Sequence, residues 1–198
     1  MSATSGLWSE SSPAPWRAAL DRYPEVIARQ GVSRLPELDG WYREALPRAL
    51  AEREPPHAEH AELVRLTEWK MARGVWRAPN LVLVQQNDPR DVIEASTEAL
   101  RLAPDPRAPI ARLAKLGGVG PATASALMAA ARPDVYPFFD ELVAAQVPGL
   151  GKLGWTLAFY TRYAEALRER AARLGGAWTP AAVERALWAH SGGKASAI

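Results

Sequence analysis

The chain has 198 residues, of which 48% are hydrophobic, and this composition excludes a chain that is disordered throughout. Its formal net charge is only +2, so a nucleic-acid partner would have to be held by local basic patches rather than by a strongly basic surface. Cysteine is absent, which excludes disulfides, thiol nucleophiles and cysteine-ligated iron–sulfur clusters.

The sequence also argues against a membrane protein. No apolar run reaches the roughly 18 residues of a membrane span, and the first residues, Met-Ser-Ala-Thr-Ser-Gly, lack the basic and apolar parts of a secretory signal. We expect a cytoplasmic monomer without membrane contact. His57 and His60 are interpreted as part of a polar helix face rather than as a zinc site, because the chain has only three histidines.

In chain order, the composition and spacing of the residues predict an all-α protein. Residues 1–14, rich in Ser, Ala and Pro, are expected to be mobile, and residues 191–198 to form a flexible tail. Residues 15–190 are expected to form a single helical domain of two lobes. Residues 80–85 are β-prone, but they are too short and isolated to demand a sheet. Helical spacing of apolar residues predicts helices over 15–30, 38–50, 60–74, 89–102, 155–174 and from Pro180 onward.

The helix predicted over residues 60–74 has an unusual mixture of basic and aromatic residues. Lys70, Arg73 and Arg77 follow at i, i+3 and i+7, so on a continued helix they would form one basic stripe beside Trp69 and Trp76. Such a stripe could grip phosphate and stack a base. The alternative is that the long basic side chains extend over a buried tryptophan pair.

A glycine-rich hairpin is predicted over residues 113–131. Leu113 and Leu116 have helical spacing, the glycines that follow break that helix, and Pro121 suits the first turn of a new one. A helix that begins this way exposes backbone N–H groups without an intrahelical partner, and their partial positive charge favours a phosphate. Without side chains at Gly118 and Gly120, a DNA backbone could come close. The alternative is a helix cap without a ligand.

The string Leu116-Gly-Gly-Val-Gly-Pro-Ala-Thr-Ala124 closely resembles the helix-hairpin-helix motif of DNA-binding proteins. The resemblance implies that the duplex backbone binds at this hairpin. The residues it assigns to DNA binding are Leu116, Gly118, Val119, Gly120, Pro121, Ala122, Thr123 and Ala124.

A second signal follows in the loop 133–141, where Pro137 precedes Asp140. In the helix-hairpin-helix base-excision DNA glycosylases, the hairpin is followed by a loop with a proline and an essential aspartate. That aspartate often lies eighteen residues after a slot that holds a lysine in some members, and here the slot is Ala122 and the aspartate Asp140. The chain therefore resembles this superfamily over roughly residues 60–145, with an expected helix-hairpin-helix glycosylase-like fold and no iron–sulfur cluster.

The resemblance implies a base-excision repair enzyme that hydrolyses the C1′–N bond of a flipped base in double-stranded DNA. A carboxylate at Asp140 would stabilise the sugar cation and orient or deprotonate a water. Because alanine cannot form a Schiff base, Ala122 implies a monofunctional glycosylase without lyase activity. Asp140 also suits the N-cap of a helix that begins at Glu141, and the two roles are compatible.

Two further sets of residues complete the expected site. The target base must leave the stack and enter a pocket, and the residues expected to line it are Glu68, Trp69, Lys70, Arg73, Tyr136, Phe138 and Phe139. No cofactor is required, but the resemblance implies that a monovalent cation (K or Na) can bind the backbone carbonyls of Ala114, Leu116 and Val119.

Two alternatives to a DNA glycosylase stay open. One is a helix-hairpin-helix binding protein that does no chemistry, and the other is an N-glycoside hydrolase that acts on RNA or nucleotides. The modest net charge favours both, whereas the preserved spacing from Ala122 to Asp140 favours the glycosylase. A glycosylase would be associated with the nucleoid when it is bound to DNA.

Overall fold

The fold is described here from a computed structural model, over residues 6–194. All regular structure in these residues is helical and none of them forms a strand, so the all-α prediction is confirmed for this part of the chain. The β-prone residues 80–85 lie in helix α6 (Ala78–Gln85), which packs against α5 (His60–Arg73). Here tertiary packing decides over local β propensity.

The N-terminal helices begin earlier than predicted. They are η1 (Leu7–Ser9), α1 (Pro13–Asp21), α2 (Tyr23–Ala28), α3 (Leu35–Gly40), the π-helical turn η2 (Trp41–Ala45) and α4 (Leu46–Glu52). Leu7 is only 3% exposed and belongs to the core. The expectation of a mobile segment over 1–14 is therefore corrected for residues 6–14, and residues 1–5 lie outside the described residues.

The middle helices match the sequence pattern in part: those predicted over residues 60–74 and 89–102 are found, whereas the helix that contains Leu113 ends there and does not include Leu116. The middle helices are α5, α6, α7 (Pro89–Leu102), α8 (Ala108–Leu113) and α9 (Pro121–Ala131). The start of α5 is fixed by a reciprocal capping box between Glu59 and Glu62, and that of α7 by the Asp88 carboxylate, which accepts a hydrogen bond of 2.8 Å from the Arg90 N–H. These caps satisfy N–H groups that would otherwise lack a partner.

The C-terminal helices are α10 (Glu141–Ala144), α11 (Leu157–Leu174) and α12 (Pro180–His190). Thr179 caps α12, which begins at Pro180 as predicted, and Trp188 is fully buried. The expected tail from Ser191 is not loose at its start, because Lys194 Nζ donates to the Gly74 carbonyl at 3.0 Å. Residues 195–198 of that tail lie outside the described residues.

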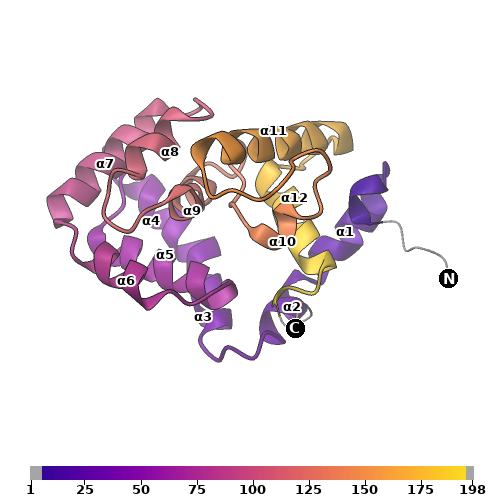
Figure 1. The fold of residues 1–198 in the computed structure, drawn as a ribbon, viewed down its shortest axis with the longest axis horizontal. Helices are drawn as coiled ribbons and strands as arrows, with labels where there is room; N and C mark the ends of the chain where they lie inside the picture. Colours follow the sequence, from indigo (N-terminus) through magenta and orange to yellow (C-terminus); the bar gives the residue numbers. More distant parts are fainter. Residues whose placement is uncertain (1–5, 195–198) are drawn as a thin grey trace.

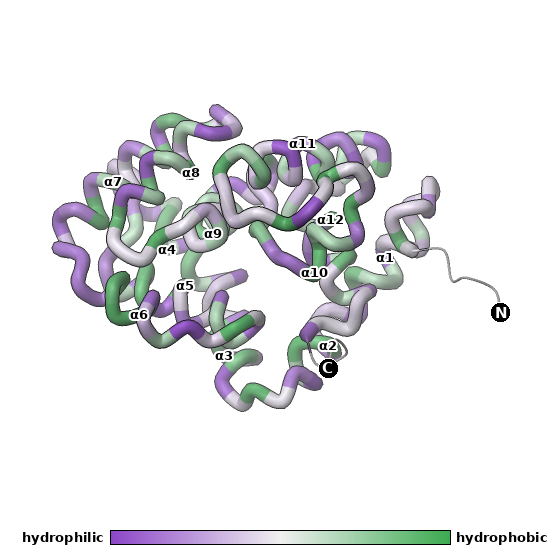
Figure 2. Tube along the Cα trace, viewed as in Figure 1, coloured by the Kyte–Doolittle hydropathy of each residue, from purple (hydrophilic) through white to green (hydrophobic). Residues whose placement is uncertain are grey.

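The helices fall into two groups (Figure 1). Helices α3 to α9 form one group. Helices α10 to α12 form the other together with α1 and α2, which pack against α12. One continuous hydrophobic core runs through both groups, from Leu7 to Ala189. The outer helices α7 and α11 alternate between hydrophilic and hydrophobic residues along their length (Figure 2), as expected for helices with one face in the core. None of the described helices combines the length and apolar character that crossing a membrane requires.

Candidate active site

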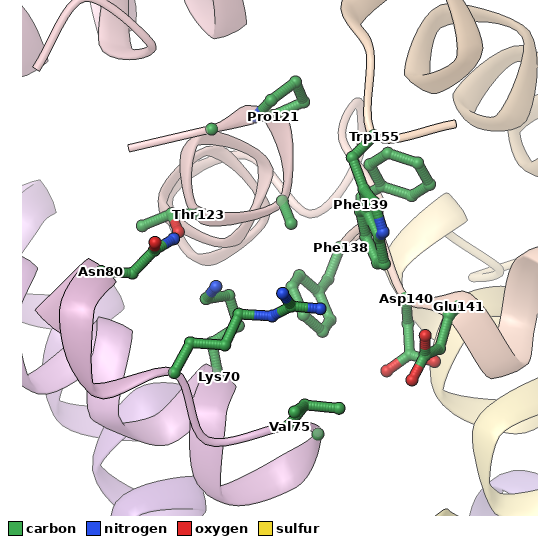
Figure 3. Close-up of a pocket in the computed structure, with 14 residues that line it drawn as sticks. Lys70, Val75, Asn80, Pro121, Thr123, Phe138, Phe139, Asp140, Glu141 and Trp155 are labelled. Carbon is green, nitrogen blue, oxygen red and sulfur yellow. The ribbon is translucent and has the colours of Figure 1, made fainter. Parts of the chain in front are cut away.

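A cavity of about 300 Å³ lies where the start of α9, the end of α5 and the loop before α10 meet (Figure 3). Its walls combine backbone of a helix start, two cations, two carboxylates and three aromatic rings. The lining residues are Lys70, Gly74, Val75, Arg77, Asn80, Gly120, Pro121, Ala122, Thr123, Phe138, Phe139, Asp140, Glu141 and Trp155.

The hairpin turn (residues 114–120) joins α8 to α9 and is built around Gly118. This glycine has a φ of +71°, and a Cβ placed on it would lie 2.6 Å from the Asn80 carbonyl and 2.9 Å from Leu83 Cβ. The missing side chain is therefore required by the packing of the turn against α6. This corrects the expectation that Gly118 is bare so that DNA can approach. A Cβ on Gly120, in contrast, would meet nothing within 4 Å.

Asn87 holds the hairpin turn from the side of α6. Its Oδ1 accepts a hydrogen bond of 2.7 Å from the Gly117 N–H, and its Nδ2 donates to the Gly117 carbonyl at 2.9 Å. The same Nδ2 donates to the Val84 carbonyl at 2.9 Å, which ties the clamp to α6. Asn87 lies just before the helix predicted over 89–102, and the sequence pattern gave no sign of this clamp.

The first turn of α9 faces the cavity. Gly120 is the N-cap residue with an extended backbone, and Pro121 occupies the first helical position. Ala122 lines the cavity together with Thr123. The hairpin residues Leu116 and Val119 are buried, and Ala124 is buried within α9, so these three stabilise the hairpin rather than present side chains.

Asp140 lies on the side of the cavity opposite the α9 start (Figure 3). Its Oδ1 accepts hydrogen bonds from the N–H groups of Leu142 at 2.8 Å and Val143 at 3.3 Å, so it caps α10. Asp140 is only 7% exposed. The carboxylate is therefore held in one orientation and shielded from bulk water.

The loop that carries Asp140 is fixed by hydrogen bonds from two other helices. The Phe139 N–H donates to Ser125 Oγ on α9 at 3.0 Å. On α11, the Tyr163 hydroxyl donates to the Phe138 carbonyl at 2.7 Å and the Tyr160 hydroxyl to the Pro137 carbonyl at 3.2 Å. These bonds set the position of Asp140 relative to α9.

A buried ion-pair network lies behind Asp140. Arg73 is 1% exposed and pairs with Glu184 of α12, and one of its terminal nitrogens lies 3.9 Å from Asp140 Oδ2. Burial raises the pKa of Glu184, with Arg73 acting in the opposite direction. The Arg73 side chain also packs over the ring of Trp188, with 4.4 Å from its Cζ to the ring centroid.

Only some of the residues expected to line a base pocket line the cavity. Lys70, Phe138 and Phe139 line the cavity, whereas Glu68, Trp69, Arg73 and Tyr136 do not. Trp69 stacks on Tyr42 in the core with ring centroids 3.6 Å apart. Tyr136 is buried and its hydroxyl donates to the Asp105 carbonyl at 2.8 Å. Glu68 lies 3.5 Å from an Arg34 nitrogen. Placement of these four residues in the pocket is therefore corrected.

The basic stripe on a continued helix is also corrected, because α5 ends before Gly74. Arg73 turns into the core, while Lys70 and Arg77 line the cavity from α5 and from the residue before α6. Trp76 lies outside the cavity lining and is 54% exposed.

Val75, Asn80, Glu141 and Trp155 line the cavity although the sequence had not assigned them to a site. Asn80 lies in the segment interpreted as β-prone. Trp155 was assigned to the start of a long helix, but α11 begins only at Leu157, and Trp155 lies in the preceding loop with 45% exposure and its ring 4.9 Å from that of Phe139. A tryptophan directly after a glycine-rich stretch was the signal that could have identified it.

The carbonyls expected to bind a monovalent cation belong to the hairpin turn. Neutral carbonyl oxygens suit such an ion, although the Leu116 carbonyl already accepts a hydrogen bond from Val119 N–H at 3.2 Å. Among residues 6–194 no group of three or more His, Cys, Asp or Glu side chains is arranged to hold a metal. His57 and His60 each contact a backbone carbonyl, at 2.7 Å and 3.1 Å.

Comparison with protein-family models, with curated proteins and with solved structures finds no match to this chain.

Proposed function

We propose that the protein is a monofunctional DNA glycosylase of the helix-hairpin-helix type that hydrolyses the C1′–N bond of a flipped base. The observation that carries the proposal is that Asp140 and the first turn of α9 line one cavity. Asp140 lies eighteen positions after Ala122, and a hydrogen bond of the loop to α9 supports the approach of the carboxylate to the hairpin.

The hairpin turn and the α9 start are proposed to bind a DNA phosphate next to the flipped nucleotide. Gly120 leaves open space there, and the N–H groups of the first turn have no helical carbonyl before them. Electrostatic attraction to the phosphate would make the affinity fall steeply with salt. A monovalent cation at the carbonyls of Ala114, Leu116 and Val119 would add positive charge at that phosphate.

Asp140 is the proposed catalytic residue. When the C1′–N bond breaks, the electron pair leaves with the base and the sugar becomes a cation that a nearby carboxylate stabilises. Asp140 can then accept a proton from the water that adds to C1′, which yields an abasic site and the free base. Ala122 provides no amine for a Schiff base at the lysine slot, so no strand cleavage is expected from that position.

The test is base release from duplexes that each carry one damaged or mispaired base, followed by alkali to cleave abasic sites. Asp140→Asn should lower release by about 10²-fold or more. Asparagine is itself a good N-cap, so this variant should fold and keep its affinity for duplexes with an abasic-site analogue. Undiminished release by Asp140→Asn would overturn the assigned role.

A second candidate is a DNA-binding protein of the same fold that does no chemistry. It is favoured by one observation: both Asp140 oxygens have structural partners, the α10 N–H groups and the Arg73 guanidinium. This candidate predicts salt-sensitive binding through the hairpin with no base release from any duplex. Gly120→Glu, which places a negative charge in open space, should then weaken binding without unfolding the protein.

A further inference from the structure

The cavity contains two cations that form no ion pair with any residue of 6–194. Lys70 comes from the last turn of α5 and Arg77 precedes α6, and both line the cavity. Within the described part of the chain, no carboxylate lies within salt-bridge distance of either, and the nearby charge that acts on Lys70 is that of Arg77. Lys70 is partly buried and Arg77 is exposed. Two neighbouring positive charges in one wall favour a ligand with negative charge or strong acceptors there.

The opposite wall has the opposite charge. Figure 3 shows Lys70 on one side of the cavity and the carboxylates of Asp140 and Glu141 on the other, with Phe138, Phe139 and Trp155 between the helix α9 and the carboxylates. The cavity is thus polarised from a cationic wall to an anionic wall. A bound group fits this field best when its positive end faces Asp140 and its negative end faces Lys70 and Arg77.

Breaking an N-glycosidic bond creates a charge distribution of this kind. We propose that Lys70 and Arg77 bind the base itself and stabilise the negative charge that it gains on leaving, so that the substrates are neutral bases with carbonyl groups rather than cationic N-alkylated purines. This inference rests on the proposed glycosylase function.

The movement of electrons during bond cleavage explains why neutral bases with carbonyl groups are preferred to cationic purines. In a neutral base, the pair of the C1′–N bond moves onto the ring nitrogen and is delocalised to the carbonyl oxygens, to which the Lys70 ammonium and the Arg77 guanidinium donate hydrogen bonds. The base then takes up one proton from Lys70 or from water, and water supplies the hydroxyl at C1′. A cationic N-alkylated purine leaves as a neutral base, so it gains nothing from the two cations and is repelled by them when it binds.

Burial lowers the pKa of Lys70, and the positive charge of Arg77 lowers it further. A lysine of lower pKa gives up its proton more readily than an exposed lysine, which suits the delivery of a proton to the departing base. Arg77 cannot do this, because a guanidinium keeps its proton, and it acts only as a fixed donor.

The experiment compares single-turnover release of uracil, hypoxanthine and 7-methylguanine from matched duplexes. Wild-type protein should release the two neutral oxo bases faster than cationic 7-methylguanine. Lys70→Met should slow oxo-base release by about 10²-fold, Lys70→Arg should recover part of that loss, and Arg77→Gln should slow it less. Arg90→Gln, an exposed cation of α7 outside the cavity, is the matched control. Faster release of 7-methylguanine by wild type would overturn the inference and leave the glycosylase function in place.

A binding experiment without catalysis distinguishes a failure of the proposed cation pair from a failure of the proposed glycosylase function. Calorimetric titration with free xanthine, an anion above neutral pH, should show at least tenfold weaker binding to the Lys70→Met, Arg77→Gln double variant. 7-Methylguanosine, titrated below neutral pH where it stays cationic, should not bind the wild type. Equal xanthine affinity for wild type and double variant overturns the role of the cation pair. If xanthine binding follows the expectation but no duplex loses a base, the proposed function fails rather than the cation pair.

Discussion

One guanidinium nitrogen of Arg73 lies 3.9 Å from Asp140 Oδ2, and the same guanidinium pairs with Glu184, so a single buried cation serves two buried carboxylates. Each of these charged groups lost its hydration when it was buried, so removing one of them leaves its partner buried without a compensating charge. The arrangement keeps a positive charge behind Asp140, which itself lines the cavity. Arg73 thus contacts Asp140 from within the core and is not part of the cavity wall.

Arg73→Met should lower the free energy of unfolding by about 3–5 kcal/mol, because it leaves Glu184 and Asp140 buried without their cation. The measurement is urea unfolding followed by circular dichroism. Removing the partner as well, in the double variant Arg73→Met, Glu184→Leu, should recover part of the loss, since it removes one of the two uncompensated charges. A double variant as unstable as the sum of the two single changes would contradict this coupling.

The same network shows where sequence reasoning stops. Arg73 has helical spacing with Lys70, which predicted that both face one ligand, but its direction is decided by Glu184, 111 residues further along the chain. Trp69 was expected in the pocket, yet its indole N–H donates to Asp39 at 2.9 Å and its ring stacks on Tyr42. Local spacing fixes which residues share a helix face, and long-range partners decide which face is buried.

Other parts of the fold could be predicted because their causes are local. Caps and proline positions set the limits of α7 and the starts of α9 and α12. The juxtaposition of Asp140 with the hairpin was expected from the family resemblance, and both line the cavity. The clamp by Asn87 and the approach of Trp155 depend on loop conformations that no periodic pattern encodes.

Asn87→Ala should loosen the hairpin turn. It removes both hydrogen bonds to the Gly117 peptide, at 2.7 Å and 2.9 Å, and we expect a loss of about 1–2 kcal/mol in unfolding free energy. Amide hydrogen exchange should then be faster in residues 114–120 than in the distant helix α12. Asn87→Asp is the informative control, because it keeps the acceptor for the Gly117 N–H but loses the donor. Unchanged exchange in Asn87→Ala would show that the turn is held by other contacts.

Gly118→Ala and Gly120→Ala form a matched pair within the hairpin. At Gly118 the left-handed backbone alone costs about 1–3 kcal/mol, and the new Cβ would lie 2.6 Å from the Asn80 carbonyl, so a clear loss of stability is expected. At Gly120 the backbone is extended and the space is open, so stability should stay within about 0.5 kcal/mol of wild type. Thermal unfolding of the two variants tests this contrast, and equal midpoints would contradict it.

The lowered pKa of Lys70 predicts a particular pH dependence of stability. Below its folded pKa, Lys70 is charged in both folded and unfolded chains, and the cost of burying the ammonium is fully present. As the pH rises towards the ordinary lysine value of 10.5, the folded protein loses this proton first, so unfolding takes up a proton and the wild type gains stability. Lys70→Met has no such group, so the stability of wild type minus that of Lys70→Met should rise between neutral pH and 10.5.

Urea unfolding at a series of pH values measures this difference directly. Lys115→Met provides the matched control, because it removes one positive charge from an exposed position on the hairpin turn. Subtracting its pH profile from that of Lys70→Met removes the effect of net charge and leaves the contribution of the cavity lysine. A difference that stays constant over this pH range would mean that Lys70 is no more protected from water than Lys115, and the cationic wall of the cavity would then be open to solvent.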